Sequence, residues 1–151
     1  MKFEKKDIHE IQKVTNSFHD WCCTCFNYDV INKRLLIETE YIGIKGKRII
    51  VFNDVEYFEM IGGDSWGNHP EFPRIIEWCF MLDNTLLCKL KDYFLKQNRH
   101  NEHIHCPNFG NLFQTKILLH SGNVIDVMCK DIEIRENKEM LVETEKQTLN
   151  K

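Results

Sequence analysis

The spacing of apolar side chains predicts one helix at the start of the chain. Between residues 4 and 18, Ile8, Ile11 and Phe18 recur at three- and four-residue steps, with Val14 or Thr15 completing the stripe. Charged and amide side chains occupy the other positions, as in a helix that packs one face on a core. His19 and Asp20 follow directly, and we expect them to close the helix and fix the next turn.

From Trp21 onward the apolar period changes to two, which predicts β-strands. Residues 21–28, 34–42 and 47–52 alternate in this way and are joined by short segments rich in turn-forming residues. Sequential antiparallel pairing is the most economical topology for such strands, so we expect a β meander. A further alternating run covers residues 55–61.

The second half of the chain mixes strands with irregular segments. Glycine and proline exclude regular structure from residues 62–73, and a strand follows at 74–82. Residues 85–97 fit either a helix or a strand, and the strand is favoured by context. A polar loop covers 98–110. Runs at 112–119 and 123–135 flank His120-Ser121-Gly122, which predicts a tight hairpin because glycine supplies its positive φ.

These elements predict an α+β domain that is mostly β. Its N-terminal helix packs on an antiparallel meander, which forms a strongly curved sheet or a two-layer sandwich. We place the single domain at residues 1–136 and a charged C-terminal tail at 137–151. At 151 residues, with 42% hydrophobic and 28% charged side chains, the chain can form a substantial core without metal or disulfide.

Charge and targeting signals indicate the expected location of the protein and the partners it is expected to lack. The longest apolar runs fall far short of the roughly 20 residues that span a bilayer, and the N-terminus lacks the apolar segment of a secretory signal. Seven cysteines are then expected to be reduced thiols in a cytoplasmic protein. A net charge of −3 with scattered basic residues disfavours nucleic-acid and membrane partners.

One histidine-rich segment carries ligand types that suit zinc. It contains His100, His103, His105 and Cys106. A structural zinc site draws paired ligands from two segments, and the second pair would come from Cys22, Cys23 and Cys25 or from His69. The spacing matches no standard zinc finger, so a solvated loop is the favoured interpretation. Zinc remains the alternative cofactor, and no cofactor is the main expectation.

Catalytic motifs are absent from the sequence. The serines, Ser17, Ser65 and Ser121, lie in no nucleophile elbow, and no glycine-rich nucleotide loop is present. The Cys22-Cys23-Thr24-Cys25 run lies on a predicted strand, where Cys23 and Cys25 should share one face and serve as buried filling. We therefore expect no catalytic residue.

The segment around Trp66 is the predicted partner-binding site. A tryptophan among glycines and acidic groups is typical of a protein-binding hot spot, although Trp66 could equally fold back onto the core. The candidate residues are Asp64, Trp66, His69, Glu71 and Phe72. Their acidic side chains favour a basic partner.

The order of these motifs resembles that of small bacterial immunity-type proteins. The resemblance covers roughly residues 15–135 and lies in the His19-Asp20 pair, the strands 35–37 and 49–52, Trp66-Gly67 and the Ser121-Gly122 hairpin. It implies a non-enzymatic protein that binds and neutralises a partner toxin. The alternative is a zinc-binding or thiol-dependent enzyme that uses residues 100–106.

Overall fold

A computed structural model gives the fold. It describes residues 1–41, 43, 46–62, 73–81, 88–89, 91–93, 95–96 and 109–137. The named elements follow in chain order: β1 (Lys2–Glu4), the 3-10 turn η1 (Lys5–Asp7), α1 (Ile8–Thr15), η2 (Asn16–Phe18), β2 (Cys22–Asp29), β3 (Arg34–Glu40), β4 (Lys47–Asn53), β5 (Tyr57–Ile61), β6 (Ile75–Met81), η4 (Phe109–Asn111), β7 (Phe113–Leu119), β8 (Val124–Cys129) and β9 (Asp131–Asn137).

The predicted N-terminal helix is confirmed as α1 with a 3-10 turn at each end. Ile11, Thr15 and Phe18 are buried along its apolar stripe. Asp20 ends the helical segment in the left-handed conformation, with φ of 66°, and its amide donates to the Ile75 carbonyl over 2.8 Å. The His19 Nδ1 and Asp20 Oδ2 atoms lie 2.9 Å apart, so this pair fixes the turn as expected. No described helix is long and apolar enough to span a bilayer.

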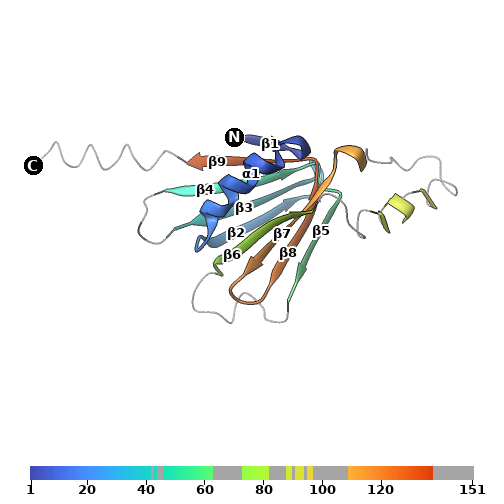
Figure 1. Cartoon of the computed structure of the whole chain (residues 1–151). Helices are drawn as coiled ribbons and strands as arrows, with labels where there is room; N and C mark the ends of the chain where they lie inside the picture. The colour runs from blue at the N-terminus through green and yellow to red at the C-terminus, as the bar shows by residue number, and fades with distance from the viewer. Residues whose placement is uncertain are drawn as a thin grey trace, which may run out of the picture.

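The strands form two antiparallel sheets (Figure 1). The first has the order β1-β9-β4-β3-β2, and the second has the order β5-β8-β7-β6. Strands β2, β3 and β4 pair sequentially, which confirms the meander, and the chain then leaves for the second sheet at β5. The predicted α+β, mostly β class is confirmed.

The hairpin around Ser121 is confirmed, but the run after it is not one strand. Gly122 adopts φ of 85°, and its amide donates to the Leu119 carbonyl over 2.9 Å. The chain crosses from β8 in the second sheet to β9 in the first at Lys130. The inward positions shift from Ile125, Val127 and Cys129 to Ile132 and Ile134 at this crossing, because the apolar spacing there is three residues instead of two.

The strand favoured for residues 85–97 is wrong. The described residues 88–89, 91–93 and 95–96 are helical. The three- and four-residue apolar spacing that made this segment ambiguous was therefore the correct signal. The predicted C-terminal tail lies outside the described residues, except for Asn137, which ends β9.

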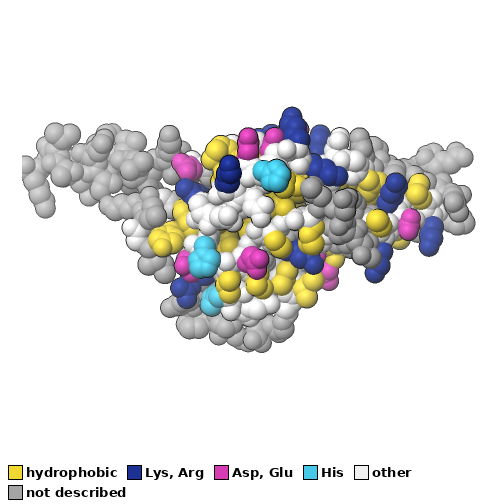
Figure 2. Space-filling view, in the orientation of Figure 1, with side chains coloured by type: hydrophobic (Ala, Val, Ile, Leu, Met, Phe, Trp, Pro, Cys, Tyr) yellow, Lys and Arg dark blue, Asp and Glu magenta, His cyan; other side chains and the backbone are white. Residues whose placement is uncertain are grey.

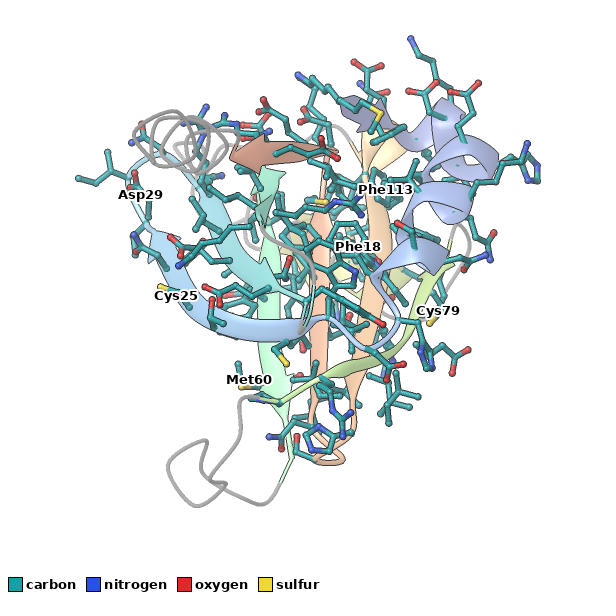
Figure 3. All side chains as sticks on the ribbon, turned by 90° about the vertical axis from the view of Figure 1, so that its left-hand side faces the viewer. Phe18, Cys25, Asp29, Met60, Cys79 and Phe113 are labelled. Atoms are coloured by element: carbon teal, nitrogen blue, oxygen red, sulfur yellow. The ribbon has the colours of Figure 1, made fainter. Side chains whose placement is uncertain are left out.

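One hydrophobic core joins the inner faces of both sheets and the helical segment (Figure 3). Phe18 lies at its centre, with ring centroids 5.4 Å from Trp21 and 5.6 Å from Trp78. The buried Trp78 Nε1 donates to Thr115 Oγ1 over 2.6 Å, which satisfies the indole. The same core therefore packs both sheets.

Arg48 covers the core where the helical segment ends. Its guanidinium carbon lies 5.3 Å from the Phe18 ring centroid and 4.6 Å from that of Trp21. It also donates to Ser17 Oγ over 3.2 Å and lies 3.4 Å from Glu136 Oε1. A planar cation thus shields two rings from water while its nitrogens keep polar partners.

Candidate protein-binding surface

The residues chosen from the sequence for partner and metal binding all lie outside the described residues. This applies to Asp64, Trp66, His69, Glu71 and Phe72, and equally to His100, His103, His105 and Cys106. Both sites therefore stay predictions. Among the residues that the structure does describe, no three histidine, cysteine or acidic side chains gather as metal ligands would.

A β-bulge separates the cysteines of β2. The register with β3 shifts between Cys23 and Cys25, so that Cys23 is buried and Cys25 is exposed. The expectation that both thiols share a face is wrong, because the extra residue reverses the alternation. Figure 3 shows Cys25 on the outer side of the strand. Burial raises the pKa of the Cys23 thiol to about 12, so this thiol stays protonated and unreactive.

The outer face of the second sheet carries ionisable groups that satisfy one another. Asp126 is buried, accepts from Gln114 Nε2 over 2.5 Å and lies 3.4 Å from Lys116 Nζ. The Tyr57 hydroxyl donates to Glu59, and this hydrogen bond raises the pKa of Tyr57 to about 12. A tyrosine that stays protonated at neutral pH is a poor general base, so we interpret the bonds of Tyr57, Glu59 and Asp126 as structural.

The turn between β2 and β3 carries apolar side chains that do not pack on the core. Its geometry is fixed by Asp29, whose carboxylate accepts from the Asn32 amide over 3.1 Å and from Asn32 Nδ2 over 2.6 Å. The side-chain bond from Asn32 is the main cause of a lowered pKa for Asp29. Lys33 closes the turn with φ of 49°. Residues 30 and 31 are thus held between two ordered positions.

Those two residues are apolar and point into solvent. Val30 is 72% exposed and Ile31 is 91% exposed. We call this pair the Val30–Ile31 tip. Single exposed apolar residues are ordinary, but two adjacent branched aliphatic side chains at the end of an ordered turn offer a compact apolar knob. The knob loses little conformational freedom when a partner covers it, because its backbone is already fixed.

The base of the tip is bound to the neighbouring turn between β4 and β5. The Val55 amide donates to the Lys33 carbonyl over 2.9 Å, and Lys33 Nζ lies 3.0 Å from Glu56 Oε1. Arg34 Nε donates to Asn53 Oδ1 over 3.1 Å. These cross-turn bonds make the tip part of a rigid end of the molecule.

A hollow lined by lysines lies at this same end. Its volume is about 550 Å³, and the described residues that line it are Glu4, Lys5, Lys6, Gly110, Asn111 and Lys130. The pairing of β1 with β9 brings Glu4 opposite Asp131, next to Lys130. Asp131 in turn pairs with Asn53 of β4, so one row of cross-strand neighbours leads from the hollow towards the tip.

The sequence patterns predict neither feature. The pattern of residues 29–33 predicts only a turn, although two β-branched aliphatic residues between Asp29 and Asn32 are unusual turn formers. That contradiction was the available signal. No such signal marks the hollow, since Lys130 lies more than 120 positions after Lys5 and Lys6 in the chain.

Comparisons with known proteins do not identify a family for this chain. No protein-family model matches the chain, and no curated protein is similar to it at a significant level.

Proposed function

We propose that this chain is a non-enzymatic protein-interaction module whose Val30–Ile31 tip inserts into an apolar pocket of a protein partner. The observation that carries the proposal is the exposure of two branched aliphatic side chains on a turn whose backbone is fixed by Asp29 and Asn32. Burying both side chains contributes roughly 3 to 5 kcal/mol of transfer free energy, a substantial part of a micromolar interaction.

Within this class, the immunity function implied by the sequence resemblance is the specific form we propose. The partner is then a toxin that the chain neutralises by covering it. The predicted segment with Asp64, Trp66, His69, Glu71 and Phe72 remains a second proposed contact. Cys23 and Cys129 are buried thiols whose pKa values are raised by burial, which supports a reducing, cytoplasmic setting.

Affinity capture from the native host tests the proposal with three forms of the protein. The wild-type chain should recover one partner in stoichiometric amount. The double variant Val30→Ser/Ile31→Ser should lose at least about 90% of that recovery, as expected for hot-spot residues. Ile76→Ser is the matched control, because it removes a half-exposed aliphatic residue from a different surface, on β6.

Two outcomes would count against the proposal. Recovery of the same partner by the double variant would remove the tip from the interface. Recovery of the chain alone, repeated under low-salt conditions, would remove the interaction itself. If a partner is found, co-expression with it should restore growth when the partner alone is toxic, and failure to do so would reject the immunity form.

A further inference from the structure

We propose that the lysine hollow receives carboxylate side chains from the same partner, so that the partner segment beside the tip is acidic. This inference rests on the proposed function, because it assumes that a protein covers this end of the molecule. It adds that the partner must carry acidic groups, which the apolar tip alone does not require.

Three lysines line the hollow, and each of their ammonium groups has one described partner. Lys5 Nζ donates to the Gly110 carbonyl over 3.2 Å, Lys6 Nζ lies 3.3 Å from Glu4 Oε2, and Lys130 Nζ lies 3.7 Å from Asp54 Oδ2. Each ammonium has three donors, and the hydrogen bond and the two ion pairs are exposed to solvent, so they hold the lysines weakly. The described lining carries two more positive than negative charges.

The hollow and the tip are close enough to lie under one partner. Glu4 on β1 and Asp29 on β2 occupy the same end of their five-stranded sheet, four strand spacings apart. At about 4.8 Å per spacing this is roughly 20 Å, which fits within one standard protein interface. Figure 2 shows basic and acidic side chains mixed along the upper edge of the molecule, where β1 lies.

A partner that covers the tip would therefore also desolvate some of these lysines. A buried ammonium without a counter-charge is costly, so affinity requires acidic groups opposite it. Carboxylates suit the site better than a nucleic-acid backbone, since the hollow admits only a few side chains and the chain as a whole has a net charge of −3. This requirement differs from the basic partner that the acidic 64–72 segment favours.

The test uses the purified full chain and a blocked hexaglutamate peptide at low ionic strength, followed by backbone amide chemical shifts. Saturable shifts should appear at Lys5, Asn111 and Lys130 and should weaken as salt is added. Lys5→Gln/Lys130→Gln should reduce the affinity about tenfold, whereas Lys13→Gln on α1 removes one exposed charge elsewhere and should leave it unchanged.

Each other outcome overturns the inference. Absence of shifts at these residues, or equal shifts with a hexaglutamine peptide, would show that the hollow does not select carboxylates. Equal affinity for inorganic phosphate would make it a general anion site. Because this experiment needs no partner, its failure leaves the proposed function standing. The variant Val30→Ser/Ile31→Ser, in contrast, should lose partner capture and still bind hexaglutamate as the wild type does.

Discussion

Apolar side chains are covered at one end of the β3–β4 hairpin and exposed to water at the other. At the end near Glu40 and Lys47, the Arg48 guanidinium lies over the rings of Phe18 and Trp21. At the other end, the adjacent turn leaves Val30 and Ile31 in water, although Arg34 and Lys33 lie beside them. Lys33 instead bonds to Glu56, and Arg34 bonds to Asn53. The long cationic side chains next to the tip in the sequence are thus bonded to the neighbouring turn.

This comparison separates residues that the fold requires from residues that it tolerates. Side chains under Arg48 contribute to the core, so their loss should lower stability. Side chains at the tip contribute little to folding, so selection for folding alone does not account for their presence. The following substitutions test that separation, from the largest expected effect on stability to the smallest.

Phe18→Ala should have the largest effect. The ring is fully buried and lies against Trp21 and Trp78, so its removal leaves a cavity among aromatic side chains. We expect a loss of roughly 3 to 5 kcal/mol in the free energy of unfolding, measured by urea denaturation. A loss below about 1 kcal/mol would mean that the covered end is not a tightly packed region.

Arg48→Ala should have an intermediate effect. The substitution removes two cation–π contacts, the bond to Ser17 and the aliphatic cover over the rings. We expect a loss of about 1 to 2 kcal/mol. Arg48→Lys is the matched control and should recover only part of it, because an ammonium cannot stack as a plane and bond to Ser17 together. Full recovery with lysine would show that charge alone matters there.

Val30→Ser/Ile31→Ser should leave stability within about 0.5 kcal/mol of the wild type, since both side chains are exposed. The same urea experiment measures it. A loss above about 1 kcal/mol would show that the tip packs against other parts of the chain and would end the contrast between the two ends.

Acidification should disorder the tip turn. The pKa of Asp29 is lowered mainly by its bond from Asn32, so the stabilisation of the turn is present above the ordinary aspartate pKa of about 3.9 and is lost as the pH falls through the lowered value. The Asn32 amide chemical shift, followed from neutral to acid pH, should report this change. Asp29→Asn keeps an acceptor oxygen but cannot titrate, so its Asn32 shift should stay flat.

Local patterns in the sequence predicted the elements better than their assembly. The helix stripe through Ile11 and Phe18 and the glycine of the 121–122 turn each depend on neighbours in the chain, and the structure has both. The bulge at Cys23–Cys25 and the sheet change at Lys130 depend on which strand pairs with which. Packing decides which strands pair, and in the sequence this pairing is visible only as a one-residue shift in the spacing of apolar residues.

The binding surface was still harder to predict. Exposure of Val30 and Ile31 is a property of the finished fold, since the same residues would suit the interior of a strand. The hollow joins residues from the first strand's end and from the β8–β9 crossing. Neither segment carries a motif for binding, and only the pairing of β1 with β9 brings them together.

The position of β9 has a consequence for synthesis. This strand is the last of the described elements, yet it lies between β1 and β4 in the first sheet. The ribosome therefore releases β1 and the β2–β4 meander well before the strand that joins them exists. Until Asp131–Asn137 emerges, the nascent chain presents an unpaired edge at β4, which invites chaperone binding or aggregation. Folding should finish late and slowly, as expected when the decisive contacts span most of the chain.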